Sequence, residues 1–172
     1  EVMSAYLDRI EKYNPKINAI ISMRSREELI KESKLLENKE PTGWLHGIPI
    51  AIKDLAETKG LKTTWGSPIF KEHIPNFDCI VSQRIKNAGA IVIGKTNTPE
   101  FGLGSHSYNP VHGVTRNPYD LTKTAGGSSG GAAAALAARL LPIADGSDMM
   151  GSLRNPGAYN NVYGFRPSWG LV

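Results

Sequence analysis

The sequence contains little cysteine, no concentrated charge and no long apolar run, and each absence excludes a class of protein. Its single cysteine, Cys79, excludes an internal disulfide and fits a reducing compartment, so a cytoplasmic location is expected. No apolar run reaches the ~20 residues of a transmembrane helix, so no membrane partner is expected. The net charge of +4 is spread without a basic block, so no nucleic-acid partner is expected. The four histidines are not paired at metal-ligand spacing, so neither a metal nor another cofactor is predicted.

The composition is typical of a globular domain. Hydrophobic residues make up 40% of the 172 residues and charged residues 21%, which suits a chain that buries a core. Glu1 stands inside an expected helix without an initiator Met, and Leu171-Val172 stand where a strand is expected to begin. We therefore expect residues 1–172 to form a single domain fragment, with the natural start, any targeting signal and a C-terminal half outside it.

Hydrophobic periodicity indicates alternating helices and strands. Helices are expected at residues 1–13, 24–38, 78–88 and 132–141, and strands at 17–23, 45–54, 90–93, 141–144, 162–165 and 170–172. The first helix is expected to end at Asn14-Pro15. In the helix at 78–88, Ile80, Val81 and Ile85 are expected to point inward, with Gly89 as its cap. The succession of helix, glycine and strand in this region is typical of a parallel α/β layer.

A glycine- and serine-rich stretch and the helix after it organise the chain. The run GGSSGG at residues 126–131 precedes an almost wholly apolar, alanine-rich helix that is expected to be buried and to stop at Pro142. The helix is expected to point its free N-terminal amides at Ser128 and Ser129. A second glycine-containing turn presents Ser152, and glycines beside a serine let its hydroxyl project into a cleft.

Two other interpretations of the GGSSGG run are less favoured. Gly/Ser clusters are often flexible linkers, but a linker does not normally adjoin a buried helix. Glycines before a helix N-terminus also bind phosphate, but the run lacks the lysine of the P-loop and the spacing of the dinucleotide-binding motif.

Lys53 ends an otherwise apolar strand, LHGIPIAIKD, in which Ile48, Ile50 and Ile52 alternate on one face. One interpretation is a lysine that extends to solvent at the edge of the strand. The other is a desolvated lysine whose lowered pKa lets it take and return a proton.

A mechanism follows if Lys53 lies beside the two serine turns. A serine hydroxyl needs a base, and no His–Asp pair adjoins either turn. A neutral lysine can act as that base, with a second serine relaying the proton. The MMGS turn at residues 149–152 would direct successive backbone amides at the oxyanion of a tetrahedral intermediate.

The sequence resembles the amidase signature family of serine amidohydrolases. The matching motifs occur in order between Tyr6 and Val172: HGIPIAIKD, GAIVIGKTNTPEFG, TRNPYD, AGGSSGGAAAALAA, DGSDMMGSLRNP and YGFRPSWG. The resemblance implies an α/β fold with a mixed, largely parallel central sheet that helices cover on both faces. It also implies that this chain is the N-terminal portion of a longer member.

The resemblance further implies a Ser–cis-Ser–Lys triad. Ser152 would be the acylated nucleophile, Ser128 the bridging serine after a cis peptide bond, and Lys53 the base. The remaining implied roles are an oxyanion hole made by the amides of Met149, Met150 and Gly151, a cis bond that follows Gly127, a supporting hydrogen bond from Ser129, and a brace of the turn by Asp148 and Arg154.

Two departures from the family pattern are visible. Family members usually carry glycine at the position of Met150, and a side chain there narrows the allowed backbone angles. Family members are also much longer, so most of the wall that holds the acyl group is expected outside this chain.

The function expected from these observations is hydrolysis of a carboxylic amide to an acid and ammonia or an amine. The expected partner is a small-molecule amide, with a homodimer as the candidate assembly. The first alternative is the glutaminase subunit of a tRNA-dependent amidotransferase, which hands ammonia to a partner. The second is a catalytically inactive homologue or fragment.

Overall fold

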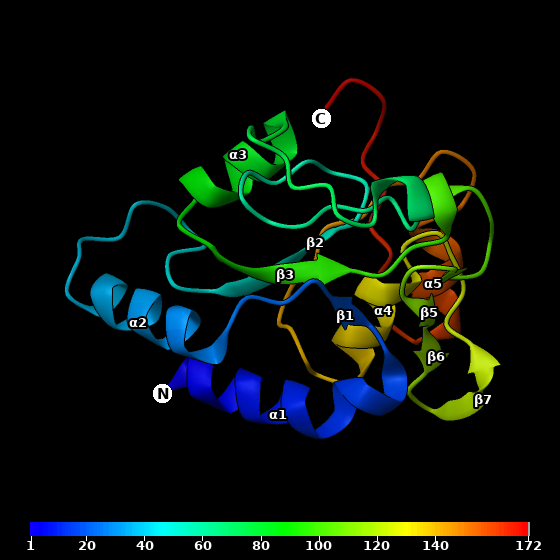
Figure 1. The fold of residues 1–172 in the computed structure, drawn as a ribbon, viewed down its shortest axis with the longest axis horizontal. Helices are drawn as coiled ribbons and strands as arrows, with labels where there is room; N and C mark the ends of the chain where they lie inside the picture. The colour runs from blue at the N-terminus through cyan, green and yellow to red at the C-terminus, as the bar shows by residue number, and fades with distance from the viewer. Residues whose placement is uncertain (172) are drawn as a thin grey trace.

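The computed structural model describes residues 1–171 (Figure 1). The helices are α1 (Val2–Ile17), α2 (Arg26–Glu37), α3 (Ile80–Asn87), α4 (Gly130–Ala137) and α5 (Arg154–Tyr159), with short 3-10 helices η1 (Pro68–Phe70) and η2 (Glu100–Gly102). The strands are β1 (Ile20–Ile21), β2 (Pro49–Lys53), β3 (Ile91–Thr96), β4 (Tyr108–Asn109), β5 (Gly113–Val114), β6 (Arg116–Asn117) and β7 (Asp120–Thr124). Within this range no helix is long and apolar enough to cross a membrane.

The central sheet has the strand order β1-β3-β2. Strand β2 runs parallel to β3, and β1 runs antiparallel to it, so the predicted mixed α/β architecture is confirmed. In the β2–β3 register, Ile52 pairs with Lys95 and Lys53 pairs with Thr96. Because paired residues share a face of the sheet, the side chain of Lys53 lies on the opposite face from that of Lys95.

Helices cover both faces of the sheet, as Figure 1 shows with α3 on one side and α1 and α4 on the other. One buried cluster joins α1 and α4 to the sheet through residues such as Leu7, Ala51 and Ala134. The other packs the α3 side against Ile50 and Ile52. Every residue of β2 is buried, so the strand leads Lys53 into the interior from an apolar stem.

Helix α4 is buried as predicted but ends earlier than Pro142. Its first six residues are all buried. The chain turns at Arg139, whose φ of 56° is left-handed. The amide of Leu140 donates to the carbonyl of Ala135, and that of Arg139 to the carbonyl of Leu136, which is the Schellman arrangement that ends many helices.

Several predicted strand boundaries are wrong. The strand expected at 17–23 shortens to β1, that at 45–54 begins at Pro49, and that at 90–93 extends to Thr96. Residues 141–144 and 162–165 form no strand, because no backbone among residues 1–171 pairs with them as a ladder. Of the strand expected at 170–172, Val172 lies outside the described residues, and Gly170 and Leu171 are not extended into a strand.

Helix α3 has a different inward face from the one predicted. Ile80 is 68% exposed and Val81 38% exposed, whereas Ser82 is fully buried. The helix begins only at Ile80, so Ser82 and Ile85 turn toward the sheet. The hydroxyl of Ser82 lies 3.2 Å from Thr58 Oγ1, so a polar contact replaces the expected apolar one.

Helix α1 continues through Pro15 to Ile17, past its predicted end. A proline in the last turn removes only one backbone donor there. The side chain of Asn14 accepts the amide of Ile20 at 2.9 Å, and Asn18 closes the helix in a left-handed conformation. These local hydrogen bonds stabilise an end that the Asn-Pro pair alone does not predict.

Gly131 makes the closest approach of α4 to the sheet, and its replacement by alanine is expected to destabilise the fold. A Cβ at this position would lie 2.7 Å from the carbonyl oxygen of Ala19 and clash with the backbone of Asn97, neither of which is a mobile side-chain end. We expect Gly131→Ala to lower the free energy of unfolding by about 2 kcal/mol despite the better helix propensity of alanine.

Urea denaturation checks this prediction, with Ala137→Gly as the control. Ala137 is the last residue of the same helix. Ala137→Gly lowers the helix propensity without a clash, which is expected to cost about 1 kcal/mol of unfolding free energy. The prediction is wrong if Gly131→Ala unfolds at the urea concentration of the unmodified protein.

Candidate functional site

Lys53 lies at the centre of a cluster of serine hydroxyls. It is the last residue of β2 and is only 2% exposed, so the interpretation as a solvent-exposed edge lysine is wrong. Its Nζ donates to Ser128 Oγ at 2.7 Å, to Ser129 Oγ at 2.9 Å and to Ser147 Oγ at 3.0 Å. Three hydroxyls therefore match the three protons of an ammonium group. The same geometry also suits a neutral amine that accepts a proton from one of them.

Burial lowers the pKa of Lys53 to about 8, and the nearby carboxylates of Asp145 and Asp148 partly offset this effect. Desolvation disfavours the charged form of a lysine, whereas an opposite charge favours it. At pH 7 about a tenth of Lys53 is neutral, and the neutral fraction reaches about a half near pH 8. The side chain can therefore take up and release a proton in the ordinary working range of enzymes.

The loop before α4 holds Ser128 and Ser129 in place. The peptide bond between Gly127 and Ser128 is cis, as predicted. Both serines are almost fully buried, and the hydroxyl of Ser107 donates to the carbonyl of Ser128 at 3.3 Å. The GGSSGG run is thus an ordered, buried loop, and its interpretation as a flexible linker is wrong.

The first amides of α4 do not point at the serines as expected. The amide of Gly130 donates to Ser107 Oγ at 3.0 Å, and that of Gly131 donates to the carbonyl of Asn97 at 3.1 Å. These contacts satisfy donors that a helix N-terminus leaves free. They also leave the hydroxyl of Ser129 available to Lys53 in place of a capping role.

Asp148 organises the turn that carries Ser152. Its carboxylate accepts the amides of Gly151 at 2.7 Å and Leu153 at 3.1 Å. Arg154 donates to the same carboxylate from Nε at 3.0 Å and from an Nη at 2.9 Å. These hydrogen bonds, with that of Arg154 first, hold the pKa of Asp148 well below its usual range. The carboxylate therefore stays ionised and keeps the turn closed across the ordinary pH range.

Ser152 adjoins the cluster through its backbone. Its carbonyl accepts the amide of Ser129 at 3.1 Å, which ties the second serine turn to the first. Ser152 is partly exposed, whereas Ser128 is buried, so the two serines lie on the open and the closed side of the site. Among residues 1–171, the three hydroxyl partners of Lys53 do not include that of Ser152.

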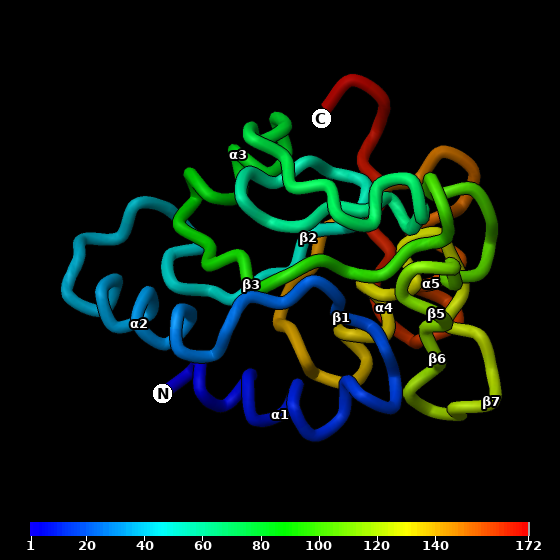
Figure 2. The backbone as a smooth tube through the Cα atoms, in the orientation of Figure 1, coloured from blue at the N-terminus to red at the C-terminus, as the bar shows by residue number. Residues whose placement is uncertain are grey.

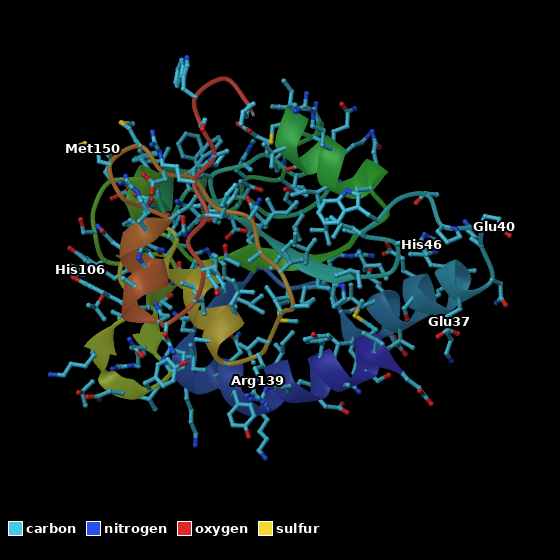
Figure 3. The ribbon with its side chains drawn as sticks, turned by 180° about the vertical axis from the view of Figure 1, so that it is seen from behind. Glu37, Glu40, His46, His106, Arg139 and Met150 are labelled. Carbon is cyan, nitrogen blue, oxygen red and sulfur yellow. The ribbon has the colours of Figure 1, made fainter. Side chains whose placement is uncertain are left out.

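The amides expected to form the oxyanion hole differ in their surroundings. That of Gly151 donates to Asp148, so in this structure it is not free for a substrate oxygen. The side chains of Met149 and Met150 are 85% and 87% exposed, and Figure 3 shows Met150 at the outer end of the molecule. Asp148, at the start of the turn, accepts the amide of Gly151, and this hydrogen bond is why that amide points inward.

Histidine is not part of the Lys53 cluster in the described chain. Figure 3 shows His46 at the end of the molecule opposite Met150, and His106 at the same end as Met150. The ring of His106 is occupied by a contact of 3.0 Å with Thr124 Oγ1. Among residues 1–171, no group of three or more His, Cys, Asp or Glu side chains is arranged to hold a metal.

Sequence reasoning missed two polar residues at the site. Ser147 supplies the third hydroxyl at Lys53 Nζ, and the carboxylate of Asp145 accepts the backbone amide of Lys53 at 2.7 Å. Figure 2 shows the segment after α4 rising beside β2, which brings both residues to the end of that strand. Both lie in the quoted motif DGSDMMGSLRNP, but a motif alone does not reveal which of its polar side chains face the lysine.

Comparisons with known proteins agree on one family. A family model described as Amidase matches residues 1–172. The chain is 47% identical over 172 residues to a glutamyl-tRNA(Gln) amidotransferase subunit of Sulfurisphaera tokodaii, a match that covers 100% of this chain and 36% of that protein. The chain therefore spans about a third of the length of this relative.

Two solved structures show the same likeness. The glutamyl-tRNA(Gln) amidotransferase subunit of Thermotoga maritima has a TM-score of 0.77 and 39% identity, covering 90% of this chain and 32% of that one. The native peptide amidase of Stenotrophomonas maltophilia has a TM-score of 0.83 and 33% identity, covering 92% of this chain and 34% of that one.

Proposed function

The chain belongs to the amidase family, and from this premise we propose that its protein hydrolyses a carboxylic amide through an acyl-enzyme on Ser152. Lys53 is the base and Ser128 relays the proton. The substrate class is a small-molecule amide, R–CO–NH₂ or a short N-substituted amide. The proposed steps use side chains and backbone groups of this chain alone.

The observation that carries the proposal is the buried contact between Lys53 Nζ and Ser128 Oγ, at 2.7 Å. A lysine with a pKa of about 8 is a competent base where it lies within hydrogen-bond reach of the hydroxyl that it deprotonates. The 3.1 Å hydrogen bond between the amide of Ser129 and the carbonyl of Ser152 keeps the second turn next to that pair. A buried lysine with no hydroxyl partner would not support this function.

In the acylation step, Ser152 Oγ attacks the amide carbonyl as its proton passes to Ser128, and the proton of Ser128 passes to neutral Lys53. The tetrahedral intermediate collapses when its C–N bond breaks, and the leaving nitrogen takes the proton back through Ser128. Ammonia or an amine departs, and Ser152 is left as an ester of the acyl group. The amides of Met149 and Met150 are the proposed donors to the oxyanion.

In the deacylation step, a water molecule attacks the ester carbonyl and gives its proton to Lys53 by the same route. The C–O bond to Ser152 breaks, its oxygen regains a proton, and the carboxylic acid leaves. Ser129 and Ser147 keep Lys53 oriented through both steps, because each hydroxyl stays within hydrogen-bond distance of Nζ. The roles of Asp148 and Arg154 are to keep the turn closed.

The proposal is tested by labelling and by turnover in the intact natural protein. We expect a fluorophosphonate probe to add one label, on Ser152, and to block hydrolysis of the best substrate in a panel of aliphatic, aryl and amino-acid amides. Peptide mapping locates the label, and ammonia release reports turnover. A label on another residue with unchanged amidase activity would contradict the proposal.

A second candidate function is favoured by the 47% identity to an amidotransferase subunit. In that case glutamine is the amide, and the ammonia passes to a partner protein that acts on a charged tRNA. The distinguishing measurement is glutaminase activity of the intact protein with and without glutamyl-tRNA(Gln) and the partner protein. A rise that depends on both favours the amidotransferase, and turnover of simple amides without either favours the independent amidase.

The assembly is a separate proposal. A homodimer of the intact protein is the candidate, and light scattering at the concentration used for activity measurements tests it. A mass of one chain would contradict the homodimer and leave the proposed chemistry untouched, because each triad lies within one chain.

A further inference from the structure

A carboxylate beside Lys53 has no place in the proposed proton transfer, and it carries a further inference. We infer that Asp145 is a positioning residue that fixes the end of β2 and sets the charge state of Lys53. This inference rests on the proposed function, in which the charge state of Lys53 controls turnover. Asp145 touches neither substrate nor the reacting atoms in that mechanism.

The geometry places Asp145 at an otherwise unpaired strand edge. Strand β2 is at the border of the three-stranded sheet, so one side of it has no hydrogen-bonded strand within residues 1–171. The Oδ1 of Asp145 accepts the amide of Lys53 there at 2.7 Å. A buried backbone donor without a partner is costly. Asp145 therefore supplies the hydrogen-bond acceptor for the Lys53 amide that a neighbouring strand would otherwise supply.

Two carboxylates, those of Asp145 and Asp148, act on the charge of Lys53, and they differ in their own partners. Asp148 is neutralised by Arg154, and the Nε of Arg166 lies 3.7 Å from its Oδ1. Asp145 has no arginine partner of this kind among residues 1–171. It is accordingly the carboxylate that most strongly raises the pKa of Lys53 against the effect of burial.

The other groups around Lys53 are neutral or lie on the far face. Ser128, Ser129 and Ser147 contribute hydroxyls, which do not titrate in this range. Lys95 is a second buried lysine, but it lies on the opposite face of the sheet and donates to Thr58 Oγ1 at 3.0 Å.

The carboxylate of Asp145 also acts on the charge of this second lysine. Burial lowers the pKa of Lys95 to about 8, and the nearby carboxylates of Asp54 and Asp145 act against that effect. Burial raises the pKa of Asp145, and the Lys53 amide and the two lysines draw it back. The carboxylate of Asp145 thus raises the pKa of two buried lysines, Lys53 and Lys95. A neutral residue in its place removes this effect from both.

Asp145→Asn in the intact protein tests the inference. The asparagine keeps an oxygen for the Lys53 amide and removes the charge, so the pKa of Lys53 should fall. We expect the acid limb of the kcat/KM profile to move down by about one pH unit. At a pH below both midpoints, Asp145→Asn then retains a certain fraction of its own plateau kcat/KM. This fraction is about ten times the corresponding fraction for the unmodified protein. Asp145→Ala should shift equally and also lose kcat, because the amide of Lys53 loses its acceptor.

A direct titration makes the result independent of turnover. The ¹³Cε shift of Lys53, assigned with Lys53→Arg in lysine-labelled protein, should titrate about one pH unit lower in Asp145→Asn. Asp120→Asn is the matched control, since Asp120 is exposed and its carboxylate, among residues 1–171, accepts hydrogen bonds only from Thr122 in the same strand, β7. Should Asp145→Asn fail to fold, Asp145→Ser, which is smaller and also neutral, carries the same measurement.

The two proposals fail separately. An unchanged Lys53 titration in the neutral variants overturns the inference about Asp145 while the amidase activity stands. A shifted titration in a protein that turns over no amide supports the inference and overturns the proposed function.

Discussion

Ser152→Ala in the intact protein is expected to reduce kcat for the best amide substrate by about 10⁴-fold or more, with little change in KM or in stability. The hydroxyl is the proposed nucleophile, and nothing else in the turn can form the ester. Ser152 is partly exposed, so removal of its oxygen leaves no buried polar partner unsatisfied. Ammonia release under saturating substrate measures the loss, and thermal unfolding measures the stability.

Ser147→Ala is the matched control for this prediction. Both serines lie in the same Gly-containing segment. Among residues 1–171 the hydroxyl of Ser147 hydrogen-bonds Lys53 alone, and its contacts with Ser129 are made by its backbone, so Ser147→Ala should lower kcat far less. If Ser152→Ala retained the turnover of the unmodified protein on every amide it accepts, the nucleophile would have to be another group. The fluorophosphonate label would then fall elsewhere, which gives a second check.

The residues around Lys53 could be predicted from the sequence to the extent that each has a local signal. An apolar strand that ends in lysine and a glycine-flanked serine pair before an apolar helix are both patterns of composition and spacing. The structure places Lys53 within 2.7 Å of Ser128, which those patterns suggest but do not measure. Resemblance to the family connected these two stretches, in which Lys53 and Ser128 are 75 positions apart.

The parts that could not be predicted depend on tertiary contacts. No local pattern shows that Ser107 rather than Ser128 or Ser129 receives the first amide of α4. Nor does the sequence reveal that Asp148 takes the amide of Gly151, which was expected to serve the oxyanion. Predicted strands failed for a related reason, because a strand exists only with a neighbour to pair with.

Lys53→Met is expected to lower kcat/KM at pH 7 by about 10³-fold and to remove the midpoint near pH 8 from the pH profile. In the unmodified protein, kcat/KM should rise about tenfold per pH unit up to a midpoint near pH 8, where burial places the pKa of Lys53. Without the base, activity should instead rise with hydroxide concentration, so some rescue is expected at high pH. Lys53→Ala should behave alike, with its fold retained.

Lys53→Met should also stabilise the protein. The sign of this change in the free energy of unfolding separates a catalytic lysine from a structural one. The pKa of Lys53 is about 8 in the folded protein against an ordinary value of 10.5, so the unfolded chain binds more protons between those values. Stability of the unmodified protein therefore rises with pH across that window, and below it the charged lysine costs about 3 kcal/mol. Removing the charge recovers this cost in free energy. The gain is reduced by the free energy of the three hydrogen bonds that Lys53 makes with serine hydroxyls. We expect Lys53→Met to unfold at higher urea concentration than the unmodified protein at pH 7, and at nearly the same concentration at pH 10. A variant that is both inactive and markedly less stable at pH 7 would instead identify Lys53 as a residue that the fold needs.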